Sequence, residues 1–281
     1  MTRGTARSSA RGSLPAVPIR GLIGVIHLLP LPGDPAHQSG GFAAAYERAQ
    51  ADAEALVSAG VDGLIVENFG SAPFVKGCAG DRIPPHQAAA LARVCLSCKA
   101  LGVPVGVNCL RNDGHTALGI AAACELDFIR VNVHTGAYVT DQGLIEGEAA
   151  STLRYRAGLG ARVEIWADVL VKHAAPLAPV DAATATHDCL DRGLADAVIV
   201  TGAATGAPVD AALLAEVRGA AGGKPVVIGS GFCLANAQTL LAHANAAIVG
   251  TWLKRDGVVR NPVDPERART LVAACRGRFA S

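Results

Sequence analysis

The chain has 281 residues, of which 51% are hydrophobic and 17% charged, and its 25 Lys and Arg residues nearly balance its 24 Asp and Glu residues. This composition excludes an intrinsically disordered chain, and a formal net charge of +1 with 4% aromatic residues disfavours nucleic acid as a partner. No apolar run approaches the roughly 20 residues that cross a bilayer, so no transmembrane segment is expected.

The first residues of the chain contain arginines and serines, but no acidic residue and no apolar stretch typical of a secretory leader. We predict a disordered tail over residues 1–19 and a single domain over residues 20–281. Eight cysteines are scattered through apolar stretches, so reduced, buried thiols and a cytoplasmic location are expected. Cys95 and Cys98 form a C-x-x-C pair inside a helical stretch, where neither zinc binding nor redox activity is expected.

Eight short runs rich in Val and Ile recur from residue 22 onward, and each is followed by a loop and an Ala-rich helical stretch. The runs cover residues 22–28, 64–68, 104–110, 128–134, 163–169, 197–202, 225–231 and 246–251. Nearly continuous apolar runs are typical of parallel strands covered on both faces. Several helical stretches end at glycines, namely Gly60, Gly102, Gly160, Gly193 and Gly223.

Eight strand–helix units in a chain of this length predict an α/β fold, a single-domain (β/α)₈ TIM barrel. A doubly wound open sheet is the alternative, but the even repeats and the lack of an early G-x-G-x-x-G disfavour it. Long loops follow the first, second and fourth strands, over residues 30–41, 69–85 and 135–147. We expect them to act as binding loops or lids at the carboxyl ends of the strands.

Strand alternation predicts which polar side chains point into the barrel. The predicted inward set comprises Asn108 of the third strand, Arg130, Asn132 and His134 of the fourth, and Glu164, Trp166 and Asp168 of the fifth. Arg130 and Glu164 are expected to form a buried ion pair, because an unpaired buried charge is costly. His134 and Asp168 lie nearer the strand ends and are expected to contact a ligand.

Further candidates lie at other strand ends: His27 after the first strand, Glu67 and Asn68 after the second, and Lys172 after the fifth. Lys172 could pair with a phosphate, act as a base if desolvated, form a Schiff base with a carbonyl group, or simply be solvated. His27, Glu67, His134 and Asp168 could together bind a divalent metal. No ligand-spacing motif requires a metal or any other cofactor, so the cofactor stays unknown.

Small residues follow the last three strands, where barrels frequently bind phosphate. The predicted phosphate-binding side includes Thr201, Thr205, Ser230, Gly231, Gly250 and Thr251. Glycine and small side chains let backbone N–H groups approach an anion, and a helix starting near Leu234 is expected to add its dipole.

Several blocks of the sequence resemble the BtpA/SgcQ family. They are GVIHLLPLPGDP, VDGLIVENFGSAPF, RVNVHTGAYVTDQGLIEG, VKHAAP and VGTWLKRDGVVRNP, over residues 24–35, 61–74, 130–147, 171–176 and 249–262. The resemblance implies a TIM barrel. The family takes its name from a cyanobacterial factor needed to accumulate photosystem I, and its enterobacterial branch is described as related to nucleotides or sugar phosphates. Asp141 in the third block joins the predicted substrate-binding residues, and Ser71 stands where the family has Asp.

Two functions follow from these observations. The first is an enzyme (a lyase, isomerase or hydrolase) acting on a small phosphorylated metabolite, with Asp168, His134, Lys172 and Glu67 as catalytic residues. It predicts that Asp168→Asn abolishes turnover without unfolding the chain. The second is a non-catalytic assembly factor for a membrane complex, which predicts an exposed apolar patch. Self-association is also expected, on a surface that the sequence does not identify.

Overall fold

The computed structural model describes residues 19–202 and 208–280. Nearly all of the predicted tail, and the predicted ligand residue Thr205, lie outside the described residues.

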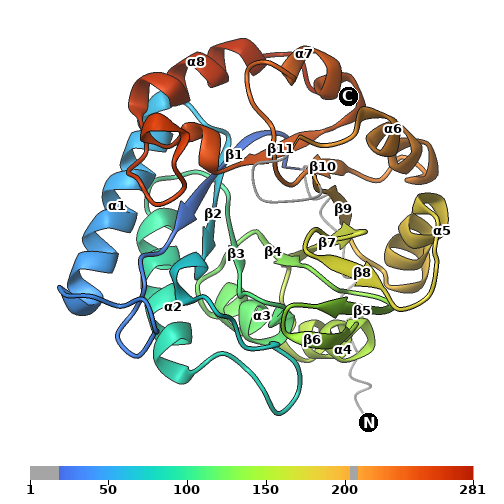
Figure 1. Ribbon diagram of the computed structural model, residues 1–281, viewed down its shortest axis with the longest axis horizontal. Helices are drawn as coiled ribbons and strands as arrows, with labels where there is room; N and C mark the ends of the chain where they lie inside the picture. Colours follow the sequence, from blue (N-terminus) through green and yellow to red (C-terminus); the bar gives the residue numbers. More distant parts are fainter. Residues whose placement is uncertain (1–18, 203–207, 281) are drawn as a thin grey trace, which may run out of the picture.

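Eight parallel strands close into a barrel, which confirms the predicted (β/α)₈ fold (Figure 1). The barrel strands are β1 (Gly21–His27), β2 (Gly63–Glu67), β3 (Val105–Asn108), β4 (Phe128–Val131), β7 (Glu164–Val169), β9 (Ala197–Val200), β10 (Val226–Ile228) and β11 (Ala246–Val249). Closure is made by β1, which pairs with both β2 and β11. Most strands end before the predicted apolar run does, so the last residues of those runs belong to loops at the barrel mouth.

Eight α-helices surround the barrel in the described chain (Figure 1). They are α1 (Gly41–Ala59), α2 (Pro85–Lys99), α3 (Gly114–Ala123), α4 (Ala149–Leu159), α5 (Ala182–His187), α6 (Ala211–Ala220), α7 (Ala237–Leu240) and α8 (Pro265–Cys275). Short helical turns are η1 (Phe69–Ser71), η2 (Asp188–Arg192), η3 (Leu241–His243), η4 (Thr251–Leu253) and η5 (Arg255–Gly257). None of the described helices is both long and apolar enough to cross a membrane.

Glycines end helices as predicted where the residue after the helix has a left-handed conformation. Gly60 closes α1 with φ of 92° and Gly160 closes α4 with φ of 60°, and both donate backbone hydrogen bonds to the preceding turn. Gly193 differs, because it follows the η2 turn with φ of −82° and is not a left-handed cap.

A small antiparallel sheet lies at the barrel mouth, and two of its strands occupy the loop that was predicted over residues 135–147. It consists of β5 (Ala137–Thr140), β6 (Gly143–Glu146) and β8 (Ala174–Pro176), in the order β6-β5-β8. β5 and β6 form a hairpin after the fourth barrel strand, while β8 follows the fifth. The inner face of the sheet rests on a separate apolar cluster that includes Val133, Tyr138, Ile145 and Val171.

The barrel interior is closed at its amino end by stacked rings. Phe128 and Trp166 stack with 3.9 Å between ring centroids and are fully buried. The Trp166 indole N–H donates to Glu164 at 2.8 Å. Glu164 is the Cα partner of Phe128 in the register, so it lies at the amino end, one step below Arg130. The predicted Arg130–Glu164 pair is therefore wrong, since the long Arg130 side chain extends toward the mouth.

Both cysteines of the C-x-x-C pair are buried in α2. Burial raises the pKa of Cys95 well above its ordinary value and that of Cys98 to about 12. Both thiols therefore stay protonated at neutral pH, which disfavours the thiolate chemistry that a metal ligand or a redox centre needs.

Candidate functional site

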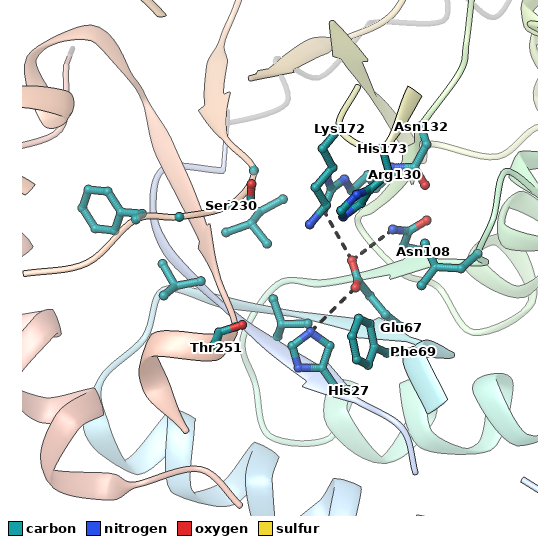
Figure 2. A pocket seen from close by; sticks show the side chains of 18 of the residues that line it. His27, Glu67, Phe69, Asn108, Arg130, Asn132, Lys172, His173, Ser230 and Thr251 are labelled. Atoms are coloured by element: carbon teal, nitrogen blue, oxygen red, sulfur yellow. Dashed lines mark hydrogen bonds and ion pairs between the residues drawn. The ribbon is translucent and has the colours of Figure 1, made fainter. Parts of the chain in front are cut away.

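A cavity of about 570 Å³ opens at the carboxyl-terminal mouth of the barrel (Figure 2). This volume is typical of small-molecule sites, and the mouth is the face where barrel enzymes place their chemistry. Most of the predicted site residues line it, namely His27, Glu67, Asn108, Arg130, Asn132, Asp141, Lys172, Ser230, Gly231, Gly250 and Thr251. Figure 2 shows Lys172, Arg130 and Asn132 together on one side, with Ser230 and Thr251 on the other.

Arg130 is held by two carboxylates at the base of the cavity. Its Nε and Nη2 donate to the two oxygens of Asp168, both at 3.1 Å, and its Nη1 lies 3.5 Å from Glu67 Oε1. Burial alone would lower the pKa of this guanidinium, but the charges of Asp168 and Glu67 outweigh burial and raise its pKa. Arg130 therefore stays charged, and it has a fixed orientation.

Asp168 is not among the residues that line the cavity, so the structure does not place its carboxylate where the predicted acid–base role requires it. Its side chain is fully buried, and both oxygens accept hydrogen bonds from Arg130. Asn132 Nδ2 donates to the same carboxylate at 2.6 Å. The β7 register directs Asp168 into the barrel, as predicted, but the longer Arg130 covers it. Asp168 is thus a positioning residue for Arg130 and Asn132.

Glu67 and His27 form the second group in the cavity. Glu67 Oε1 accepts from Asn108 Nδ2 at 3.0 Å, and Oε2 lies 3.9 Å from His27 Nε2. The His27 ring packs on Phe69 with 4.7 Å between centroids. Burial, together with the charges of Lys254 and Lys172, lowers the pKa of His27 well below its ordinary value, so the imidazole is neutral at pH 7. A carboxylate and a neutral imidazole in contact can accept and pass on protons.

Two buried polar atoms of the cavity lack partners. His27 Nδ1 and Asn132 Oδ1 make no hydrogen bond within the described part of the chain. A buried polar atom without a partner is costly, and a bound ligand or water is the usual way to satisfy it. Both residues line the cavity, so these atoms are candidate contacts for a bound molecule.

Arg111 is a cavity residue that sequence reasoning missed. It directly follows the third apolar run, so its place at a strand end was the available signal. Its Nη2 donates to the carbonyl oxygen of Lys172 at 2.6 Å, and the residue is buried. Burial lowers its pKa from the ordinary value, although the charge of Asp168 opposes this. Aromatic side chains missed at the same cavity are Phe69, Phe74, Phe232 and Trp252.

Lys172 lies on the turn between β7 and β8. Its backbone N–H donates to Thr201 Oγ1 at 3.1 Å, and its carbonyl accepts from Arg111. Burial, then the charge of Arg130, lowers its pKa to about 8. Thr201 itself does not line the cavity, so its predicted substrate contact is replaced by support of the Lys172 backbone.

His134 lies away from the cavity, contrary to prediction. β4 ends at Val131, so strand alternation no longer applies three residues later. The His134 ring is buried, and its Nε2 is 2.7 Å from the carbonyl oxygen of Gly193. Burial lowers its pKa. His134 therefore holds the η2 turn against the base of the hairpin and does not face a ligand.

Asn68 also does not line the cavity. Its Oδ1 accepts from the backbone N–H of Leu110 at 2.7 Å, and its Nδ2 donates to Gln87. Gln87 in turn donates to Asp34, which also accepts from the Ser71 hydroxyl at 2.7 Å. These bonds fasten the loops after the first three strands to one another. Ser71 belongs to this loop network.

The predicted metal ligands are not brought together. His27 and Glu67 are neighbours, but Asp168 is engaged by Arg130 and His134 lies elsewhere. Across the described ranges, no group of three His, Cys, Asp or Glu side chains is placed to hold a metal ion.

The side of the cavity near β10 and β11 is formed by small residues. A Cβ atom added at Gly250 would lie 2.5 Å from His27 Cε1, so only glycine fits there. Ser230 Oγ accepts from the Gly202 N–H at 3.1 Å. The backbone N–H groups of Gly231 and Thr251 have no acceptor among the described residues. These amides are available to an anion.

The helix expected from Leu234 does not supply a dipole to this side. The segment after β10 is a loop in which Asn236 Oδ1 accepts from the Cys233 N–H at 2.9 Å. Asn236 Nδ2 donates to the Gly231 carbonyl at 2.8 Å. The helix that follows, α7, has only four residues. Any anion binding here therefore depends on loop amides and on the cationic side chains across the cavity.

Comparison with known proteins gives a family and a fold. Residues 19–277 match the model of the BtpA family. A photosystem I biogenesis protein BtpA of Synechocystis sp. is 48% identical over 254 residues, which cover 90% of this chain and 87% of the relative. An uncharacterized protein of Thermococcus kodakarensis is 45% identical over 89% of this chain and 93% of its own. The sgc region protein SgcQ of Escherichia coli is 30% identical over 88% of this chain and 91% of its own.

Solved structures with the same fold are distant in sequence. Mycobacterium tuberculosis tryptophan synthase superposes with a TM-score of 0.58 at 17% identity, covering 92% of this chain and 93% of the other. Phosphoribosyl anthranilate isomerase from Thermus thermophilus superposes with a TM-score of 0.53 at 15% identity, covering 90% of this chain and 97% of the other. At this level the similarity extends to the fold alone.

Proposed function

The chain belongs to the BtpA family, and from this premise we propose that it is an enzyme acting on a small phosphorylated metabolite, a sugar phosphate or a nucleotide-like compound. One observation carries the proposal: three cationic side chains, those of Arg111, Arg130 and Lys172, line a single cavity at the barrel mouth. Buried positive charges converging on a cavity favour a polyanionic ligand. The loops after β10 and β11 complete the cavity with backbone amides that have no acceptor among the described residues, at the position where barrels often bind phosphate.

The chemistry best supported is acid–base catalysis by Glu67 and His27. Both line the cavity and contact each other, whereas the predicted catalysts Asp168 and His134 do not line it. Glu67 can take a proton from a bound metabolite, and Arg130 beside it can stabilise the negative charge that develops. Asp141, on the β5–β6 turn, lines the outer part of the same cavity and can contact polar groups of the ligand.

Binding measurements test the proposal directly. Isothermal titration calorimetry of the full chain with ribose 5-phosphate, inorganic phosphate and unphosphorylated ribose compares one sugar with and without its charge. We expect heat from the first two and none from ribose. Equal behaviour of ribose and ribose 5-phosphate would overturn the proposal, because the cationic cavity would then contribute nothing to recognition.

Replacing Gly250 with alanine is expected to weaken phosphate binding at least about 10-fold, because one extra methyl group fills the space beside His27 Cε1. Gly250 has a φ of −115°, so alanine at this position does not need the left-handed conformation that favours glycine. Gly219→Ala is the matched control: this glycine lies in α6, and a Cβ there meets nothing within 4 Å. The control should leave binding unchanged and stabilise the fold by about 0.5–1 kcal/mol. Equal phosphate affinity in both variants would remove the loops near β11 from the site.

An assembly role is a second candidate, favoured by one surface and by the name of one relative, a photosystem I biogenesis protein. The side chains of Val139, Leu144 and Leu177 are 49%, 42% and 62% exposed, and they lie on the small sheet or directly beside it. Leu177→Glu would block docking through this face and leave phosphate binding intact, which separates the two functions. The cytoplasmic location and the self-association stay predictions.

A further inference from the structure

We infer that Lys172 is the nucleophile of this site, forming a covalent imine with a carbonyl carbon, and that the substrate is therefore a phosphorylated aldehyde or ketone. The inference rests on the proposed function, since it assumes that a phosphorylated metabolite occupies the cavity. It adds the chemical class of that metabolite and the bond that the chain forms with it.

The Lys172 backbone is held firmly at the cavity. Its N–H donates to Thr201 and its carbonyl accepts from Arg111, so both backbone groups are fixed by other barrel units. The turn that carries it contains two left-handed residues without glycine, Leu170 with φ of 50° and His173 with φ of 57°. Such conformations cost energy and persist only where the surroundings enforce them, commonly at functional sites.

The ammonium of Lys172 is not needed as a structural ion-pair partner. Glu67 and Asp168 are engaged by Arg130, and no ion pair of Lys172 is found within the described residues. Two guanidiniums, Arg111 and Arg130, already supply permanent positive charge to the same cavity. A third cation would add little to the attraction of an anionic substrate. A neutral Lys172 amine beside the two guanidiniums can instead attack a substrate that they hold.

The surroundings also keep part of this amine neutral. Burial and the charges of Arg130 and Arg111 lower the pKa of Lys172 to about 8, against the opposing charges of Glu67 and Asp168. About a tenth of the molecules then carry a neutral amine at pH 7, compared with far fewer for an ordinary lysine. Desolvated lysines near other cations are the usual imine-forming type.

Glu67 can carry the protons that the step requires. The Lys172 ammonium gives one proton through a water molecule to the Glu67 carboxylate, and the amine lone pair forms a C–N bond as the carbonyl π electrons move onto oxygen. One proton passes from nitrogen to that oxygen, giving a carbinolamine. Glu67 then returns its proton to the hydroxyl group, water leaves, and an iminium cation remains. The balance is one ammonium and one carbonyl converted into one iminium and one water.

The iminium then serves as an electron sink. Loss of a proton or cleavage of a carbon–carbon bond at the adjacent carbon leaves its electron pair in an enamine. Protonation of that carbon and addition of water return the free lysine and a carbonyl product. No oxidant, metal or further reactant is required.

Reductive trapping tests the inference on the full wild-type chain. Dihydroxyacetone phosphate is the probe, with sodium cyanoborohydride as the reductant of the iminium, and peptide mass mapping locates the adduct. We expect one adduct per chain at Lys172, suppressed by excess inorganic phosphate. Lys224 is the internal control, because it is exposed just before β10 at the other end of the barrel and should show neither selective labelling nor suppression.

Lys172→Arg separates nucleophilicity from charge. It should bind dihydroxyacetone phosphate within about 3-fold of wild type but give no adduct, and Lys172→Met serves if the arginine variant fails to fold. Binding of the probe by wild type without any adduct at Lys172 would overturn this inference and leave the proposed function standing. Failure to bind the probe or any phosphate ester would overturn both.

The pH dependence gives a second readout. Neutral amine forms as the pH rises through the lowered pKa, so trapping at Lys172 should increase with pH and level off above about 8. An ordinary lysine would continue to gain reactivity toward pH 10. A trapping rate at Lys172 that kept rising past pH 9 would contradict the neutral-amine mechanism.

Discussion

Asp168→Asn is expected to lower the free energy of unfolding by about 3–5 kcal/mol, because it leaves the buried Arg130 charge without its two-point partner. In the native chain, Asp168 Oδ2 accepts from both Arg130 Nη2 and Asn132 Nδ2. Asparagine replaces one carboxylate oxygen with an NH₂ group, which would then face N–H donors of Arg130 or Asn132. Glu67 cannot compensate, since its nearest oxygen is 3.5 Å from Arg130 and already accepts from Asn108. Urea denaturation followed by circular dichroism measures the loss.

Asp191→Asn is the matched control for this substitution. The Asp191 side chain is 71% exposed and, within the described residues, forms an ion pair with His187 alone, so its replacement should change stability by less than about 0.5 kcal/mol. If Asp168→Asn were equally harmless, the Arg130 charge would have to be satisfied in some other way, and the positioning role of Asp168 would fail. This expectation replaces the sequence-based one, in which the variant lost turnover without losing stability.

Arg111→Met is expected to weaken the binding of ribose 5-phosphate by about 30-fold or more. A buried charge that contacts a ligand anion contributes on the order of 2 kcal/mol or more to affinity, and methionine keeps most of the apolar stem. Arg111 faces the cavity without a carboxylate ion pair among the described residues, so its charge is available to a ligand. Calorimetric titration gives the change in the dissociation constant.

Two further variants serve as controls for the Arg111→Met measurement. Arg93→Met removes an exposed guanidinium that lies over the Tyr46 ring on the outer surface, and it should leave affinity unchanged. Arg111→Lys keeps the charge but loses the planar fork, so an intermediate affinity is expected. Wild-type affinity in Arg111→Met would show that the anion is bound elsewhere and would count against the cationic cavity as the site.

The barrel was predictable because the recurring apolar runs in the sequence indicate its strands. The eight runs of Val and Ile, each ended by polar or small residues, correspond to the eight barrel strands. Positions of individual side chains were predictable inside the strands and became unreliable just past their ends. Arg130, inside β4, and Asn132, one residue beyond it, face the cavity as alternation required. Asn68, one residue beyond β2, and His134, three residues beyond β4, do not line the cavity.

Three features of the site could not be read from the sequence. The place of Arg111 near the end of the third strand was a signal, but in this loop no periodicity indicates the direction of its side chain. Asp168 points inward as predicted, but its burial beneath Arg130 depends on side-chain length and on the register between β4 and β7. In the small sheet, β8 pairs with β5 across about 35 residues of sequence, and such long-range pairing leaves little local signal.

That small sheet restricts how a molecule can reach the cavity. β8 begins directly after Lys172 and His173 and pairs along β5, whose hairpin carries Asp141 at its turn. Swinging the hairpin aside would pull on the chain at Lys172 and disturb the amine that the reaction needs. Substrate and product should therefore enter and leave the cavity on the side opposite the small sheet, beside Gly231 and Thr251. Because Gly231 and Thr251 also line the proposed phosphate-binding side, bulky residues there would hinder both the passage of the ligand and its binding.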